Sequence, residues 1–157
     1  MTVAVIDSGI AVNDDLTTSL GLDRVIVRWS AFSGPDTDEF GHGTHVAGII
    51  GGNGKSSSGP YAMRTFRGVA PDVRLISLKV LGEDGSGEVS NVLRGDRLGL
   101  DNRTRYDIRI VNMSLGHPVV EEVREGPALP GRRGRCTPQG SSSWSRPAAG
   151  EPWATAR

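Results

Sequence analysis

Three short segments of the chain carry residue types suited to acid–base chemistry. In the first, Asp7-Ser8-Gly9, a carboxylate follows an apolar run. In the second, residues 41–48 (Gly-His-Gly-Thr-His-Val-Ala-Gly), His42 precedes a mostly small and apolar stretch. The third, Ser114-Leu115-Gly116, follows an apolar run and ends in glycine. Because a carboxylate that accepts one imidazole N–H fixes the tautomer and stabilises the imidazolium, Asp7 and His42 are candidates for the orienting half of a nucleophilic triad.

The elements that carry these segments must bring them together. Short apolar or β-branched runs predict buried strands, and longer stretches with apolar residues at helical spacing predict helices. The expected strands lie at residues 3–6, 25–27, 73–81 and 108–113, and the expected helices at residues 42–52 and 88–100. This alternation predicts an α/β fold, a doubly wound parallel sheet with helices on both faces, in which the three segments meet at the carboxyl edge of the strands.

The helix expected at residues 42–52 has a further predicted property. Its residues after the first turn are mostly small and apolar, which favours a helix buried on most sides. Its glycines lower the intrinsic helix propensity, so contacts with the rest of the fold must hold it.

Asp7 and His42 also have simpler interpretations. Asp7 alone is compatible with an ordinary strand-end carboxylate that caps a turn. His42 and His45, one turn apart on a helix, are candidate metal ligands with a carboxylate nearby. Zinc protease motifs, however, place their histidines at i and i+4 with a glutamate between them, whereas Gly43 and Thr44 occupy the interval here. The pattern therefore favours the catalytic interpretation and predicts no metal site.

The first two segments resemble signatures of the subtilase (subtilisin-like, peptidase S8) family of serine proteases. Asp-Ser-Gly after an apolar strand and the run at residues 41–48 are similar to two of its three catalytic signatures, in the Asp-then-His order of that family. The resemblance covers about residues 2–120. It implies a subtilisin-like fold, Asp7 as the orienting carboxylate and His42 as the general base of a serine endopeptidase.

Two further stretches resemble the segments that line the substrate cleft of this family. The resemblance implies that Gly85, Ser86 and Gly87 on one side, and Ser114-Leu115-Gly116 on the other, bind a substrate. Main-chain pairing of this kind gives an extended peptide sequence-tolerant affinity, while pockets for alternate side chains set preference. The expected partner is therefore a peptide or protein segment in extended conformation.

The sequence also departs from the family pattern. The Gly-Thr-Ser signature of the family's nucleophile does not occur in the chain. The segment Ala148-Ala149-Gly150 matches the residues that precede the family's oxyanion asparagine, but Glu151 follows it. A general base without an attacking atom has nothing to activate, so we expect the chain as given to be inactive. The alternative is a nonenzymatic fragment or pseudo-protease that at most binds extended peptides.

The predicted chemistry requires no cofactor. The family resemblance implies structural calcium, for which four aspartates are candidate ligands: Asp14, Asp15, Asp36 and Asp38. Their loops show no recognisable ligand spacing, so no calcium site is assigned.

Composition excludes several classes of protein. The 157 residues include 18 basic and 18 acidic side chains, so no overall field attracts nucleic acid. No apolar run approaches the length of about 18 residues that a membrane helix needs, and no signal-peptide pattern opens the chain. The single cysteine, Cys136, excludes a disulfide scaffold. We therefore expect neither a nucleic-acid nor a membrane partner, and the compartment stays open.

The character of the sequence changes near residue 120. Residues 125–157 hold 5 basic and 2 acidic residues and 5 of the 9 prolines, with no strand or helix period. We expect residues 1–120 to form a partial catalytic domain and residues 121–157 to be a non-homologous, irregular tail. If residues 141–147 are assumed to have GC-rich codons, one shifted reading frame encodes Val-Val-Val-Val-Ala-Ala-Gly, similar to a buried strand of the family, so we hypothesise a frameshift near residues 118–126.

Overall fold

A computed structural model describes residues 1–116, 142–145 and 154–155 of the chain. Four parallel strands form the centre of its sheet: β1 (Thr2–Asp7), β2 (Val25–Ser30), β3 (Arg74–Lys79) and β4 (Ile108–Met113). Their order in the sheet is β2-β3-β1-β4. Strands β3 and β4 both pair with β1 in parallel, so the carboxyl ends of all three lie at one edge of the sheet.

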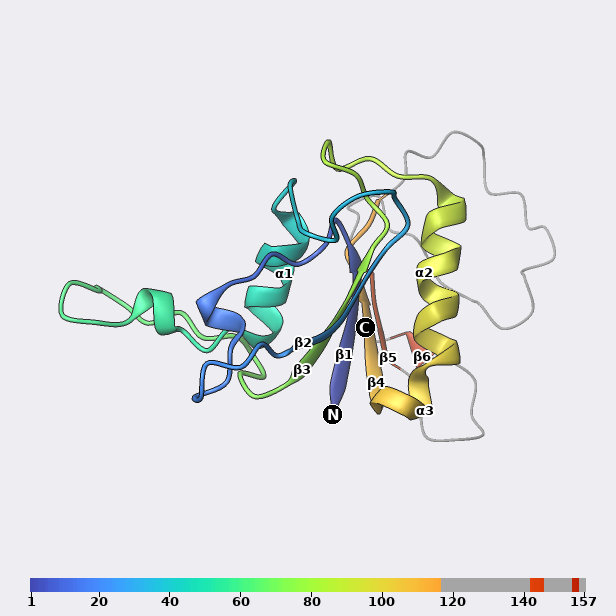
Figure 1. Ribbon diagram of the computed structural model, residues 1–157. Helices are drawn as coiled ribbons and strands as arrows, with labels where there is room; N and C mark the ends of the chain where they lie inside the picture. Colours follow the sequence, from blue (N-terminus) through green and yellow to red (C-terminus); the bar gives the residue numbers. More distant parts are fainter. Residues whose placement is uncertain (117–141, 146–153, 156–157) are drawn as a thin grey trace.

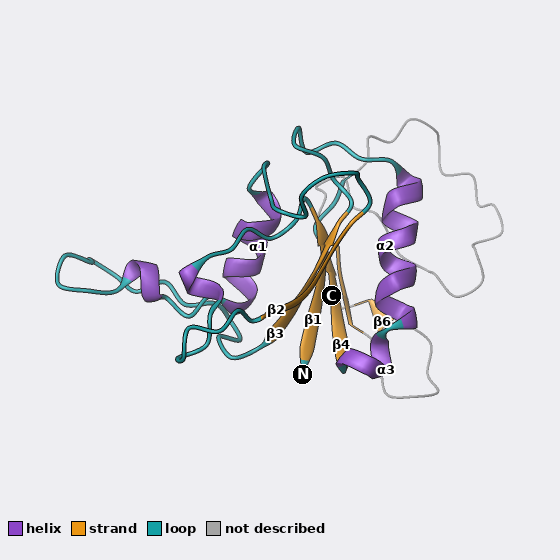
Figure 2. Cartoon of the chain, viewed as in Figure 1, coloured by secondary structure: helices purple, strands orange, loops and turns teal. Residues whose placement is uncertain are grey.

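Helices cover both faces of this sheet. Helix α1 (His42–Gly51) lies on one face, and α2 (Val89–Asp101) and the short α3 (Arg103–Tyr106) lie on the other (Figures 1 and 2). Two short 3₁₀ turns, Asp14–Leu16 and Lys55–Ser57, lie in the connections on the α1 side. The predicted doubly wound α/β class is confirmed. No helix in the described part of the chain is long and apolar enough to cross a membrane.

Strand β1 contributes side chains to two hydrophobic cores, one on each face of the sheet. All six of its residues are buried. A strand covered on both faces is expected to have a continuous apolar run in its sequence, without the alternation of apolar and polar residues seen in a strand with one exposed face. Val3 and Val5 pack into the core under α1, while Ala4 and Ile6 pack into the core under α2 and α3. Asp7, the last residue of β1, is therefore held by packing on both sides of the sheet.

Helix α1 buries one face only, so the expectation that it is buried on most sides is wrong. Its buried residues are Gly43, Ala47 and Gly51, whereas the side chain of Ile49 is 56% exposed. Residues four apart share one face of a helix, and small residues on this face let the helix backbone lie against the sheet. A Cβ atom on Gly43 would lie 2.1 Å from the carbonyl oxygen of Gly9, which shows how close the first turn comes to the end of β1.

The expected irregularity after residue 120 is corrected at two short segments. Strand β5 (Ser142–Ser145) pairs antiparallel with β4, and β6 (Ala154–Thr155) pairs antiparallel with β5. Without β5, the edge of β4 would present unpaired N–H and C=O groups. An extended segment can pair with these groups through its backbone alone, so β5 needs no alternation of apolar and polar residues in its sequence. The rest of the tail (117–141, 146–153 and 156–157) lies outside the described residues, and the domain boundary near residue 120 stays a prediction.

Arg24 joins several elements at the end of the α1-side core farthest from Asp7. Its side chain is only 4% exposed, and its guanidinium donates to four backbone carbonyls, those of Asp15, Thr17, Gly51 and Val73. Burial lowers the pKa of Arg24, and the charges of Asp72 and Asp23 act in the opposite direction. The hydrogen bonds tie the end of α1 to the residue preceding β3 and to the loop after β1.

Replacing Arg24 with methionine removes these donors and leaves buried carbonyls unpaired. Each such group costs about 1–3 kcal/mol, so we expect the free energy of unfolding to fall by about 3 kcal/mol or more, measured by urea denaturation. Arg109→Met is the matched control, because its side chain is 63% exposed and, among the described residues, makes only a 3.8 Å ion pair with Asp107. Equal stability of the two variants would contradict this role of Arg24.

Candidate active site

The structure brings Asp7 and His42 into direct contact. Asp7 ends β1 and is fully buried, and His42 is the first residue of α1. The distance from His42 Nδ1 to Asp7 Oδ1 is 2.7 Å. Gly41, with a φ of 90°, supplies the left-handed turn through which the chain enters the helix. The contact fixes Nδ1 as the donor to the carboxylate, which leaves Nε2 as the ring nitrogen with the lone pair.

Ser8 fixes the carboxylate from the backbone side. The N–H of Ser8 donates to Asp7 Oδ1 at 2.7 Å, and the Ser8 hydroxyl lies 3.3 Å from the same oxygen. Oδ1 of Asp7 thus accepts hydrogen bonds from both the His42 ring and the backbone N–H of Ser8. The second oxygen, Oδ2, is buried and has no hydrogen-bond partner among the described residues.

Asp38 caps the start of α1. The N-cap residue, Gly41, has no side chain to accept hydrogen bonds from the first turn, and the Asp38 carboxylate accepts them instead. Its carboxylate accepts hydrogen bonds from the N–H of Gly41 at 2.8 Å, from the N–H of Thr44 at 2.7 Å and from the Thr44 hydroxyl. It also accepts from the Ser8 hydroxyl at 2.8 Å, and Ser8 Oγ in turn accepts from the N–H of Gly43 at 2.9 Å. The first turn of α1 is therefore connected by hydrogen bonds to the residue that follows Asp7.

The charge of Asp38 is stabilised by these donors. Burial acts to raise the pKa of Asp38, but the hydrogen bonds from Thr44, Ser8 and Gly41 outweigh burial and place its pKa below the ordinary value. A carboxylate at a helix N-terminus also interacts favourably with the helix dipole. Asp38 is consequently a fixed negative charge under the helix that carries His42.

Lys79 anchors the loop that leads into His42. It pairs with Asp7 in the register of β1 and β3 and is only 4% exposed. Its Nζ donates to the carbonyl of Thr37 at 2.7 Å and to the carboxylate of Glu39. The hydrogen bond from Lys79, with a second from Thr37, lowers the pKa of Glu39 to about 2. The loop is thus attached to the carboxyl end of β3 just before it enters α1.

The predicted peptide-binding segments lie on either side of Asp7. One follows β3 and the other follows β4, and both strands are neighbours of β1. In the first segment, the N–H of Gly85 and the carbonyl of Ser86 bond to Gly82, and the N–H of Ser86 donates to Asp84. Among the described residues, the carbonyl of Gly85 and both backbone groups of Gly87 have no hydrogen bond, so they are available to a strand-like partner.

The second segment continues directly from β4. The Ser114 hydroxyl accepts a hydrogen bond from the side chain of Asn112 at 2.9 Å, and Leu115 packs against the core under α2. Gly116 is exposed and is the last residue described before the gap. The structure therefore places all six predicted cleft residues at the same sheet edge as Asp7 and His42.

A sequence model described as "Subtilase family" matches residues 1–155 of the chain. The chain belongs to the subtilase family. It is 38% identical over 114 residues to the minor extracellular protease Epr of Bacillus subtilis, covering 73% of this chain and 15% of Epr. It is 38% identical over 121 residues to the serine protease AprX of the same organism, covering 74% and 25%. It is 37% identical over 117 residues to a subtilisin of a Bacillus species, covering 73% and 26%. The chain thus spans 15 to 26% of the length of these three relatives.

Sequence reasoning missed the residues that position the pair in this subtilase chain. From the sequence, Asp38 is a candidate calcium ligand only, and Lys79 is part of an apolar strand and of a stretch that resembles a cleft-lining segment of the family. One signal was present for Asp38: a helix that begins after Gly41 has no side chain at its N-cap, so a nearby upstream carboxylate is needed. The burial of Lys79 depends on its contact with Glu39, 40 residues away in the chain, and has no local signature.

The structure gives the two histidines, His42 and His45, different surroundings. His42 is bonded to Asp7, and His45 lies exposed on the next turn of α1. Within the described residues, no three His, Cys, Asp or Glu side chains are grouped to hold a metal ion. Two of the four candidate calcium ligands have separate partners: Asp38 caps α1, while Asp14 pairs with Lys55 at 3.2 Å.

Replacing Asp38 with alanine removes the acceptor for the first turn of α1. We expect the free energy of unfolding near neutral pH to fall by about 2 kcal/mol, the upper range for the loss of a helix cap. Because the folded-state pKa of Asp38 is lowered, its contribution is complete above the ordinary carboxyl pKa and is lost as pH falls through the lowered pKa. The difference between the parent and the variant should therefore shrink in acid, as measured by urea unfolding.

Asp36→Ala is the control for this variant. The Asp36 carboxylate makes no hydrogen bond or ion pair with the described residues, so its removal should leave the stability nearly unchanged. An Asp38→Ala variant as stable as this control, or a stability difference that grows on acidification, would contradict the capping role.

Proposed function

We propose that Asp7 and His42 are the orienting carboxylate and the general base of a serine-type endopeptidase that hydrolyses peptide bonds through an Asp/His/Ser triad. The observation that carries the proposal is the 2.7 Å contact between His42 Nδ1 and the buried Asp7 Oδ1. Membership of the subtilase family and the protease names of the relatives support the same reaction.

Each nitrogen of His42 has its own task in this proposal. With Nδ1–H donating to Asp7, Nε2 takes the proton of a serine hydroxyl while the serine oxygen attacks the carbonyl carbon of the peptide bond. The same nitrogen returns the proton to the amine that leaves. Asp7 stays ionised throughout and stabilises the imidazolium, whose ring orientation it fixes.

The substrate in this proposal is a peptide or protein segment in extended conformation. Such a segment pairs with the unbonded backbone groups of Gly85 and Gly87 on one side and with Ser114, Leu115 and Gly116 on the other. The backbone N–H and carbonyl of Ser86 already have partners within the turn. Ser86 therefore shapes the turn between Gly85 and Gly87 and contacts the substrate through its side chain. Both flanking segments leave the strands next to Asp7, and this arrangement supports a position of the scissile bond near His42.

A second candidate function is favoured by one observation, the absence of a Gly-Thr-Ser signature from the sequence. Without a nucleophile the 157 residues bind extended peptides and do not cleave them, as a fragment or pseudo-protease would. We propose this state for the chain as given. The proposed chemistry takes no cofactor, and the proposal includes no nucleic-acid or membrane partner and assigns no calcium site.

A serine-directed fluorophosphonate probe separates the two functions. We expect no stoichiometric labelling of the 157-residue chain under conditions in which an active subtilisin is fully labelled. Labelling that is lost in the His42→Ala variant would overturn the proposal that the nucleophile is missing and would support an active enzyme. The absence of labelling, joined with peptide binding, supports the second candidate.

Peptide binding is measured by fluorescence anisotropy with a labelled apolar peptide. The matched control is the same peptide N-methylated at alternate backbone nitrogens, which cannot pair as a strand. We expect binding to weaken by about tenfold or more, as for the loss of one or two hydrogen bonds. Equal affinity for both peptides would show that main-chain pairing plays no part.

A further inference from the structure

A loop on the α1 side of the molecule projects away from the body of the fold. It comprises residues 59–66, which follow the turn at Lys55–Ser57 and extend outward in Figure 1. Its large apolar side chains lie in solvent: Tyr61 is 98% exposed, Met63 is 100% exposed and Phe66 is 71% exposed. Isolated exposed apolar side chains are common, but three in one projecting loop are available to any partner that binds apolar residues.

The backbone of this loop is almost free of internal hydrogen bonds. Among the described residues, positions 59–66 make only two through their backbone: Ala62 N–H donates to the Gly59 carbonyl, and Phe66 N–H donates to Ser57 Oγ. An endopeptidase binds its substrate as an extended strand, so a loop with few bonds to break reaches that shape at low cost.

A second exposed turn shows that side-chain exposure alone is not sufficient. Leu20 is 84% exposed, but the backbone around it is closed by hydrogen bonds from Thr18 N–H to the Leu22 carbonyl at 2.7 Å and from Gly21 N–H to the Thr18 carbonyl at 2.9 Å. An isolated bridge between Thr17 and Asp23 holds the same turn. This turn must break both hydrogen bonds and the bridge before it can bind as a strand, whereas the backbone around Tyr61 has one bond to break among the described residues, from Ala62 N–H to the Gly59 carbonyl.

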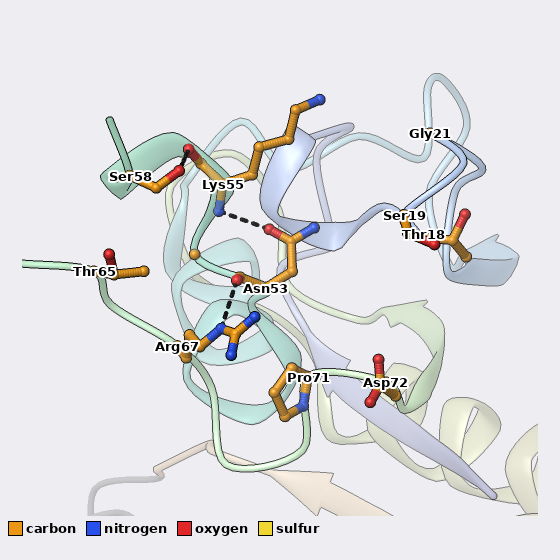
Figure 3. Close-up of a pocket in the computed structure, with 11 residues that line it drawn as sticks. Thr18, Ser19, Gly21, Asn53, Lys55, Ser58, Thr65, Arg67, Pro71 and Asp72 are labelled. Atoms are coloured by element: carbon orange, nitrogen blue, oxygen red, sulfur yellow. Dashed lines mark hydrogen bonds between the residues drawn. The ribbon is translucent and has the colours of Figure 1, made fainter. Parts of the chain in front are cut away.

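Both stems of the projecting loop are tied together below its tip. Asn53 is the centre of this junction, as Figure 3 shows: its side-chain oxygen accepts from Lys55 N–H at 2.8 Å, and its carbonyl accepts from Arg67 Nε at 3.1 Å. These residues line a polar hollow of about 720 Å³. A break in the chain beyond Ser58 leaves these contacts in place.

The order of the strands interleaves the two parts of the chain on either side of the loop. Strands β1 and β2 precede it, and β3 and β4 follow it, while the sheet order is β2-β3-β1-β4. All three parallel pairings therefore join a strand from one part to a strand from the other. Neither part can leave without breaking the sheet.

We propose that residues 59–66 are a site of proteolytic cleavage in trans, and that the cut chain stays assembled as two interleaved fragments. The endopeptidase is one that cleaves after large apolar side chains. Water adds across one peptide bond in the loop, the C–N bond breaks, and a new carboxylate and a new amino group form. Asp7 and His42 then lie on the first fragment and the cleft residues from Gly85 to Gly116 on the second. This inference does not depend on the proposed function.

Limited digestion of the full chain with chymotrypsin, followed by mass spectrometry, tests the site. Within residues 1–116, we expect the first cut after Tyr61, Met63 or Phe66, at a rate about 100-fold above that after Leu20, because the turn at Leu20 must first open. A triple variant, Tyr61→Ser with Met63→Ser and Phe66→Ser, keeps the fold and should lose this cut. An earlier cut at another bond of residues 1–116 would overturn the proposal.

Size-exclusion chromatography of the digest tests the assembly. We expect the two fragments to elute together at the volume of the uncut chain in buffer and to separate in urea. Separation of the fragments in buffer would overturn the claim that the interleaved sheet holds them together. Circular dichroism of the nicked sample should match that of the uncut chain, and loss of its signal would count against the proposal in the same way.

Discussion

The 2.7 Å contact between Asp7 and His42 depends on how closely the first turn of α1 approaches the end of β1. Two glycines make this approach possible. A Cβ on Gly43 would overlap the carbonyl of Gly9, and a Cβ on Gly9 would lie 2.6 Å from the carbonyl of Thr37. Any side chain at either position would push the helix or the loop away from Asp7. The distance between Asp7 and His42 is therefore set by the packing of the backbone around Gly9 and Gly43, and hydrogen bonds stabilise the contact at that distance.

The charged groups of this site surround the buried carboxylate of Asp7, and each has its own partner. Asp7 faces His42, Asp38 lies under the helix N-terminus, and Lys79 anchors the loop between them through Glu39. The lowered pKa values of Asp38 and Glu39 both come from donors supplied by the fold. Because each charge has its own partner, the histidine ring keeps one orientation without any contribution from a substrate, which is what a pre-organised base requires.

The sequence predicted the parts of this site that are contiguous along the chain. Asp7 after an apolar strand and His42 before a run of small residues are local patterns, and the parallel sheet follows from the alternation of strands and helices. The exposure of Ile49 could not be predicted, because it depends on which face of α1 meets the sheet. The buried position of Lys79 and the strand at Ser142–Ser145 depend on partners distant in sequence, and composition carries no trace of such pairings.

The tautomer of His42 reports whether Asp7 orients the imidazole ring. Nitrogen-15 NMR of the imidazole ring, at a pH where the ring is neutral, distinguishes a proton on Nδ1 from one on Nε2, and exposed His45 on the same helix is the reference within the chain. We predict that His42 carries its proton on Nδ1, that Nε2 is unprotonated, and that Asp7→Ala abolishes this preference. A proton on Nε2 of His42, or a tautomer unchanged by Asp7→Ala, would contradict this prediction.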